Sequence, residues 1–188
     1  NMRQDAVDRL GFGYADVKAL NDHIIYCAAV GFGSRGPYAG RPAYDDIIQS
    51  ASGLAGLFGM RDGRPAIAPS IIADKITGLT VVYAVLAALL NRERTGGGAM
   101  HVEVPMFETM VAFLMNEHLG AATFEADGKM GYHRVLAPDR RPYQTADGWI
   151  GVLPYSRENW ARMLAIIERA DVLGPWFEDA TERSRRMP

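Results

Sequence analysis

The segment APSIIADKITGLTVVYAVLAALLNRERTGGG, residues 68–98, carries the strongest helix signal of the chain. Small residues and a proline are followed by an apolar run that predicts a helix from Asp74 to Arg94. Asp74 lies at the start of this helix, where unpaired backbone N–H groups and the helix dipole stabilise a carboxylate. The same N–H groups keep a carboxylate ionised, and an apolar pocket around it would make it a better nucleophile. Position alone therefore leaves two interpretations of Asp74, a helix-capping residue or a nucleophile.

The composition of the 188 residues is that of a soluble globular protein, with 48% hydrophobic and 22% charged residues. The net charge of −2 gives no basic field, so we expect no nucleic-acid partner. The single cysteine, Cys27, cannot form an internal disulfide and suits a reducing compartment. The apolar run at 76–90 is short for a membrane span. We therefore expect a cytoplasmic protein without a membrane partner.

The hydrophobic pattern predicts a mixed α/β fold. The expected elements are helices at 4–11, 14–21, 42–59, 74–94, 106–122 and 156–170, a strand at 23–33, a loop with a short strand at 96–105, and a hairpin at 143–155. The strand at 23–33 is a continuous apolar run, which suits a buried parallel strand. Pro42 is placed to be the first residue of its helix, and Ser156 to be the N-cap of the last one.

The character of the chain changes after residue 122. We expect residues 1–122 to be the C-terminal part of a large α/β domain, 123–141 a linker, and 142–188 the beginning of a smaller α+β domain. The abrupt ends of the sequence also lead us to expect an internal piece of a longer polypeptide.

Other motifs in the chain predict little chemistry. The four histidines show no HxxxH or HExxH spacing and Cys27 adds no partner, so we expect no metal site. The loop GFGSRG at 31–36 lacks the full GxGxxG pattern and predicts a flexible turn rather than a nucleotide-binding loop. Its glycines still permit a ligand to approach the backbone closely.

The order of motifs along the chain resembles the family III CoA-transferases, which include formyl-CoA transferase, carnitine CoA-transferases and α-methylacyl-CoA racemases. The resemblance is carried by NMRQDAVDRLGFGYADVKALN (1–21), IIYCAAVGFGSRGPYAGRPAYDDIIQSASGL (24–54), IADKITGLTVVYAVLAALLNRERTGGG (72–98) and APDRRPYQTADGWIGVLPYSRENW (137–160). It implies part of a Rossmann-like large domain, a linker and the start of a small domain. It also implies a homodimer in which two chains interlock.

The resemblance assigns chemistry to Asp74, which matches the family's catalytic aspartate before an apolar helix ending in RERTG. It implies an acyl-CoA:carboxylate CoA-transferase in which this carboxylate forms covalent intermediates with acyl and CoA groups. Coenzyme A enters as the acyl-CoA substrate, a carboxylic acid is the acceptor, and no metal takes part. Oxyanions would form at several stages, so backbone N–H donors near the glycine loops would be needed.

Further residues match positions of the family that contact its substrates. The resemblance places Asn1, Arg9 and Leu10 along the CoA, and Arg3 near its phosphates. It places Tyr44 and Asp45 in the active-site wall.

Tyr44 also separates the branches of the family. The racemase branch needs a histidine at the Tyr44 position, working opposite the aspartate. Tyrosine, with a pKa of about 10, is a poor base at neutral pH, which favours the transferase. The alternatives are a 2-methylacyl-CoA racemase that exchanges the α-proton, or an inactive CoA-binding fragment in which Asp74 is only a cap.

Overall fold

The computed structural model describes residues 2–138 and 140–186. The chain divides into two compact units, Asn1–Gly131 and Tyr132–Pro188. Helices and strands are both present, so the expected mixed α/β class is confirmed. The division falls inside residues 123–141, where the sequence predicts a linker, and the domain limits themselves stay a prediction.

In the first unit the helices are α1 (Gln4–Arg9), α2 (Tyr14–Leu20), α3 (Asp45–Ala51), α4 (Leu54–Asp62), α5 (Ile72–Thr95) and α6 (Met106–His118), and the strands are β1 (Ile25–Val30) and β2 (Met100–Pro105). In the second unit they are α7 (His133–Leu136), α8 (Arg157–Ile166) and α9 (Ala180–Arg186), with strands β3 (Pro142–Gln144) and β4 (Trp149–Gly151).

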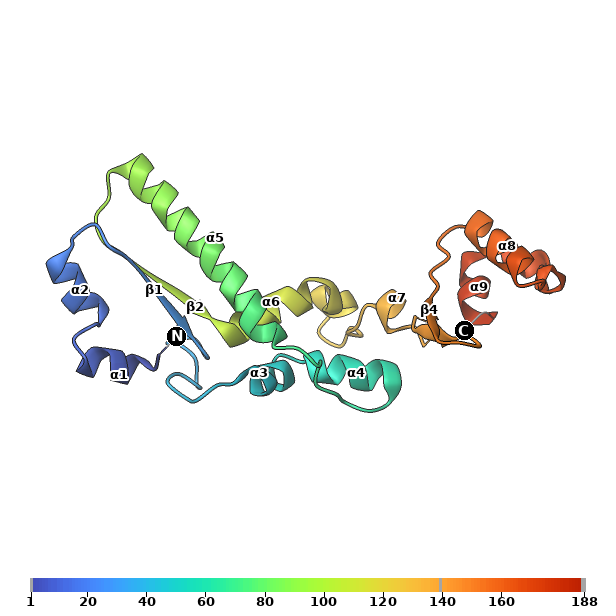
Figure 1. Cartoon of the computed structure of the whole chain (residues 1–188), viewed down its shortest axis with the longest axis horizontal. Coiled ribbons are helices and arrows are strands. Elements are labelled where there is room, and N and C mark those ends of the chain that lie inside the picture. The colour runs from blue at the N-terminus through green and yellow to red at the C-terminus, as the bar shows by residue number, and fades with distance from the viewer. Residues whose placement is uncertain (1, 139, 187–188) are drawn as a thin grey trace. The chain divides into compact units, whose positions relative to one another are not determined.

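The centre of the first unit is a parallel pair of strands, β1 and β2 (Figure 1). Parallel strands require a long crossover connection, and residues 31–99, which include α5, provide it. Helix α5 packs against both strands from one side. On the other side Tyr14 of α2 stacks on His101 of β2, and its hydroxyl donates a hydrogen bond to the carbonyl of Ala99 at 3.0 Å. The β-type apolar run predicted at 23–33 is therefore the strand β1.

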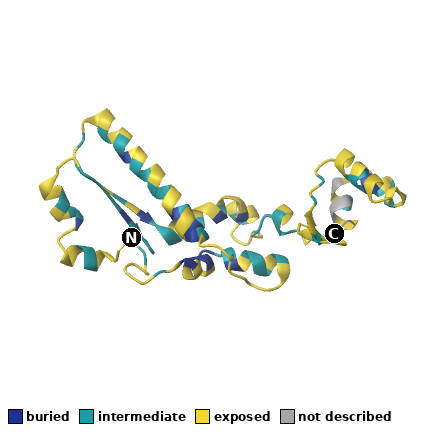
Figure 2. Ribbon diagram, in the orientation of Figure 1, coloured by how far each residue is buried: buried dark blue, intermediate teal, exposed yellow. Residues whose placement is uncertain are grey.

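The hydrophobic core lies where α3, α5 and α6 meet (Figure 2). Its buried members are Ile48, Ala73, Met110 and Leu114. Ile48, Ala73 and Met110 are completely buried. Because Ala73 directly precedes Asp74, the start of α5 is anchored in the best-packed part of the unit.

The prediction of one continuous helix at 42–59 is wrong, because the structure has two helices there and the first starts later. The first helix begins at Asp45 instead of Pro42, and the helical run breaks between α3 and α4. Gly53 has φ of 96°, a left-handed conformation that a glycine adopts without steric cost, so the chain turns there. Within α3, Ile47 is exposed and Gln49 is completely buried.

The second unit contains the predicted hairpin and the predicted N-cap. Strands β3 and β4 pair antiparallel across the turn at 145–148. The Ser156 hydroxyl accepts the backbone N–H of Asn159, and the Asn159 side chain accepts the backbone N–H of Ser156 in return. This reciprocal capping box explains why α8 begins at Arg157.

Helix α5 has 24 residues, longer than the apolar run noted in the sequence, and it is long and apolar enough to cross a membrane. This is weak evidence, because core helices of soluble proteins have the same length and composition. Its contacts with β1, β2, α3 and α6 show that one side of it packs against protein.

Candidate functional site

Asp74 is the third residue of α5, and its side chain is exposed. The residue at the N-cap position is Ile71, and no side chain of the helix itself caps this end. Throughout residues 2–138 and 140–186, the Asp74 carboxylate has no hydrogen-bond or ion-pair partner. A carboxylate engaged in capping would accept a backbone N–H group, so the geometry leaves Asp74 free for chemistry.

The backbone of Asp74 is held by a neighbouring helix. Its N–H group donates to Oδ1 of Asp45, the first residue of α3, at 3.0 Å. Asp45 is 7% exposed, and its other oxygen, Oδ2, accepts a hydrogen bond from the Gln49 side chain one turn later. A carboxylate that accepts an N–H at a helix start stabilises that start, so Asp45 caps α5 from outside the helix.

Tyr44 and Asp45, both expected in the active-site wall, lie at the start of α3. Tyr44 is 72% exposed. Asp45 is buried and both of its oxygens are engaged, which favours a positioning role over contact with a substrate. The structure therefore brings Asp45 into contact with the backbone of Asp74, and it places Tyr44 one residue before that contact.

An apolar pocket would make the Asp74 carboxylate a better nucleophile, but the described residues do not enclose this side chain. Its side chain is exposed, so the described residues do not reduce its hydration.

The glycine loop at 31–36 differs from the expected source of free N–H donors. The Gly33 N–H group donates to both carboxylate oxygens of Glu108, at 3.0 and 3.2 Å, and the Ser34 N–H donates to Glu103 at 3.0 Å. A Cβ on Gly33 would lie 2.5 Å from Glu108 Oε1. Because carboxylates of the same chain already accept these two N–H groups, Gly33 and Ser34 do not offer free donors to an anion.

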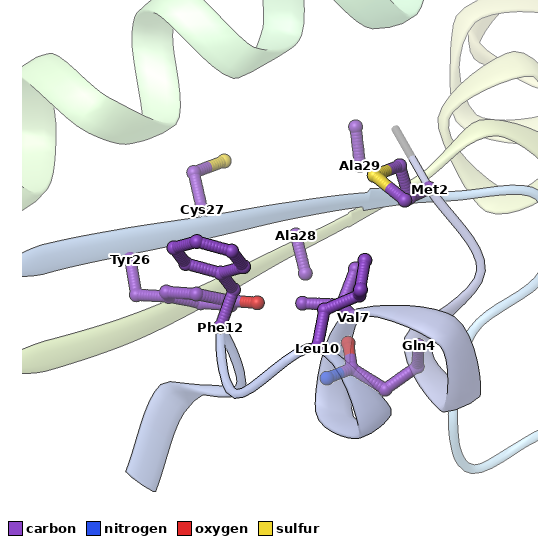
Figure 3. Close-up of a pocket in the computed structure, with 9 residues that line it drawn as sticks. All are labelled: Met2, Gln4, Val7, Leu10, Phe12, Tyr26, Cys27, Ala28 and Ala29. Carbon is purple, nitrogen blue, oxygen red and sulfur yellow. The ribbon is translucent and has the colours of Figure 1, made fainter. Parts of the chain in front are cut away.

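A cavity of about 330 Å³ lies between α1 and β1 (Figure 3). Its lining residues are Met2, Gln4, Val7, Leu10, Phe12, Tyr26, Cys27, Ala28 and Ala29. Tyr26 and Ala28 point toward α1, while Cys27 points to the opposite face of the strand. Most of the lining side chains are apolar, although polar atoms contribute nearly as much of the lining surface as apolar atoms do.

The predicted CoA-contacting residues lie on and around α1. Leu10 is 60% exposed and lines the cavity. Arg3 and Arg9 lie at the two ends of α1, and both pair with Asp5, at 3.1 and 3.7 Å. Any phosphate at these guanidinium groups would compete with that carboxylate. Asn1 lies outside the described residues.

Sequence reasoning missed Gln49, which holds the loop before α5, and Glu108, which holds the backbone of the glycine loop. A signal for Gln49 was present, because Asp45 and Gln49 are four residues apart and such pairs meet on a helix. Glu108 has no local signal, since its partner Gly33 is distant in the sequence. Among the described residues, no group of three or more His, Cys, Asp or Glu side chains is arranged to hold a metal ion.

Comparison with known proteins gives a consistent family. The model of the family "CoA-transferase family III" matches residues 1–188. The acetyl-CoA:oxalate CoA-transferase of Acetobacter aceti is 38% identical over 141 residues, which are 73% of this chain and 36% of that protein. The succinate–glutarate CoA-transferase of Agrobacterium fabrum is 31% identical over 98% of this chain and 46% of its own length. The chain thus spans less than half the length of these relatives.

Solved structures give the same result for the fold. A CAIB/BAIF family protein from Brucella suis superposes with a TM-score of 0.78 at 28% identity, over 98% of this chain and 49% of that one. The family match over every residue and the superposition over nearly the whole chain lead to one assignment. This chain belongs to CoA-transferase family III.

Proposed function

We propose that this protein is an acyl-CoA:carboxylate CoA-transferase with Asp74 as its covalent nucleophile. One observation carries the proposal: Asp74 presents an unpartnered, exposed carboxylate from a helix start whose backbone is anchored by Asp45 and by the buried Ala73. A nucleophile needs this combination of a free reacting group and a fixed backbone.

The proposed reaction balances without a net proton or electron. An oxygen of Asp74 attacks the thioester carbonyl carbon of the acyl-CoA, and the C–S bond breaks to release CoA thiolate and leave a mixed anhydride. The thiolate attacks the Asp74 carboxyl carbon, which forms an aspartyl-CoA thioester and frees the donor acid. The acceptor carboxylate and the thiolate then repeat these two steps in reverse order. The covalent intermediates on Asp74 divide one difficult exchange into several easier steps.

The racemase alternative is less favoured by the residue at position 44. Tyr44 is a poor base at neutral pH, whereas α-proton exchange needs a second base opposite the aspartate. The two relatives from Acetobacter aceti and Agrobacterium fabrum are both named as CoA-transferases.

We also propose that the protein acts as a homodimer in the cytoplasm, with the large domain completed as a Rossmann-like fold. Support for an interface comes from an apolar stripe on α5. Its members are Leu79, Val82, Tyr83, Leu86 and Leu90, each at least half exposed. The spacing of three, four and seven residues places them on one face of the helix. Exposed apolar faces of this kind mark surfaces that another protein segment covers.

CoA is proposed to bind along α1, with its less polar part in the cavity beside Leu10 and its phosphates near Arg3 and Arg9. The apolar side chains around the cavity and the two guanidinium groups at the ends of α1 support this placement, in which a phosphate would replace Asp5 as the partner of the arginines. The resemblance to the family adds Asn1 to the residues along the CoA.

The experiment that tests the function is peptide mass spectrometry after incubation of the protein, expressed from its complete reading frame, with a panel of acyl-CoAs. Trypsin releases Asp74 in the peptide 62–75, which also contains Asp62 as an internal control. Hydroxylamine converts an activated aspartyl group into a stable hydroxamate. We expect the modification on Asp74 and none on Asp62.

The matched variant is Asp74→Asn, which keeps the backbone N–H bond to Asp45 and removes the nucleophile. We expect transfer to fall on the order of 10³-fold or more, as for the loss of other nucleophiles. The loss of helix-dipole stabilisation costs about 0.5 kcal/mol, so the variant stays folded. Unchanged transfer in Asp74→Asn would contradict the proposal, and exchange of the α-proton without movement of CoA would favour the racemase.

A further inference from the structure

Gln49 links the start of α5 to the loop before it and to α3, and we propose that it acts with Asp45 as a positioning residue for the Asp74 nucleophile. The inference rests on the proposed function for its catalytic consequence. It assigns a role to a residue that takes no part in the reaction steps.

The contacts of Gln49 use its whole side-chain amide. Its Nε2 donates one hydrogen bond to Asp45 Oδ2 and another to the carbonyl oxygen of Ser70 at 3.1 Å. Its Oε1 accepts the backbone N–H of Ala68 at 2.8 Å. Both N–H bonds and an oxygen lone pair are thus used, as expected for a polar group in a protein interior.

These contacts reach Asp74 by two routes. Through Asp45, the amide orients the carboxylate that accepts the Asp74 N–H. Through Ala68 and Ser70, it holds the loop that leads into α5. The first turn of α5 is therefore fixed both from its preceding loop and from the neighbouring helix.

Burial separates this role from substrate binding. Gln49 is completely buried, so it does not touch a substrate that approaches the exposed Asp74. Its removal should change the placement of the attacking oxygen and leave ligand contacts intact. A displacement of about 1 Å lowers the rate of a positioned reaction by about 100-fold, so the effect belongs in kcat and not in KM.

The first test compares Gln49→Met with Ile48→Val in the full-length protein. Methionine keeps the length of the side chain and removes its three hydrogen bonds. Ile48→Val shortens a completely buried neighbour on the same helix without breaking a hydrogen bond. At a temperature where circular dichroism shows both variants folded, we expect kcat to fall about 10- to 100-fold for Gln49→Met and by less than about twofold for Ile48→Val. The KM for the acyl-CoA should stay within about twofold in both.

The second test exchanges the carboxylate at position 45 and the amide at position 49. Asp45→Asn alone makes two amide N–H groups face each other, and Gln49→Glu alone makes two carboxylates face each other. The double variant restores an N–H to oxygen bond between positions 45 and 49, with the direction reversed. It also keeps an oxygen for each of the Asp74 and Ala68 N–H groups, and it loses the bond to the Ser70 carbonyl, as Gln49→Glu alone also does. We expect kcat of the double variant to exceed that of either single variant, because coupled residues are not additive.

Amide hydrogen exchange gives a readout that does not need catalysis. In Gln49→Met we expect faster exchange at the Ala68 and Asp74 amides than in Ile48→Val. Equal exchange, equal kcat in the two variants, or losses that simply add in the double variant would overturn the positioning role.

Failure of the proposed function gives a different pattern. It would appear as an absence of any adduct on wild-type Asp74. Faster exchange at Ala68 and Asp74 in Gln49→Met would still support the structural link in that case.

Discussion

Oδ1 of Asp45 lies 3.0 Å from the backbone nitrogen of Asp74, so the first residue of α3 caps the first turn of α5. This contact joins two helix starts that are 29 residues apart in the sequence. It leaves the Asp74 carboxylate exposed and unpartnered among the described residues, while its backbone is fixed. In the function proposed for this chain, Asp45 holds the backbone and Asp74 supplies the reacting carboxylate.

Removal of the Asp45 carboxylate is expected to destabilise the protein. Asp45→Ala leaves the Asp74 N–H and one N–H of Gln49 without acceptors in the interior, which costs about 1–3 kcal/mol for a buried group. Urea unfolding followed by circular dichroism measures the loss. The matched control is Asp46→Ala on the exposed side of the same helix turn, which should cost about 0.5 kcal/mol through the helix dipole. Equal losses would contradict the capping role of Asp45.

Gly31 marks a close approach between the end of β1 and the residue before Tyr44. A Cβ on Gly31 would lie 2.2 Å from the Cβ of Ala43. We expect Gly31→Ala to lower the free energy of unfolding by about 1–3 kcal/mol, the usual cost of overpacking.

The control for this change is Gly56→Ala within α4, where nothing lies within 4 Å of an added Cβ. Alanine should raise stability there by about 0.5–1 kcal/mol. Thermal unfolding of both variants checks the pair. An unchanged melting temperature for Gly31→Ala would show that the two segments separate easily.

The apolar stripe of α5 is expected to be an interface of the proposed homodimer. Leu86→Asp places a charge at the centre of the stripe and should shift the protein toward monomers. Light scattering coupled to size-exclusion chromatography measures the mass. Leu20→Asp is the matched control, because Leu20 is 88% exposed and lies outside the stripe. A dimer that persists in Leu86→Asp would contradict the assignment of this face.

The Cys27 thiol should titrate at higher pH in the folded protein than in the unfolded chain. Burial disfavours the charged thiolate and raises the pKa of Cys27. As the pH rises past the unfolded pKa, the unfolded chain loses a proton that the native state keeps, so this group lowers stability there.

Peptide-level iodoacetamide labelling across pH measures the effect. We expect native Cys27 to react with a midpoint displaced to higher pH than the same protein in urea. Coincident profiles would contradict the effect of burial.

Local signals predicted much of the secondary structure. The helix at 74–94 appears as α5, the apolar run at 23–33 contains β1, and Ser156 caps α8 as predicted. These features depend on side chains within a few residues of one another, so the chain alone specifies them. The break at Gly53 was missed, because a glycine in a helical pattern is tolerated unless the tertiary fold requires a turn there.

The candidate site, in contrast, depends on contacts between residues that are distant in the sequence. The local sequence pattern placed Asp74 at a helix start, and the resemblance to the family placed Tyr44 and Asp45 in the active-site wall. Neither showed that Asp45 turns inward, that Gln49 joins it, or that Glu108 occupies the amides of the glycine loop.

Those contacts exist only in the folded chain. They form when α3, α5 and α6 pack around Ile48, Ala73 and Met110. Packing removes water from polar groups distant in the sequence, and each buried group must then find a partner within the fold.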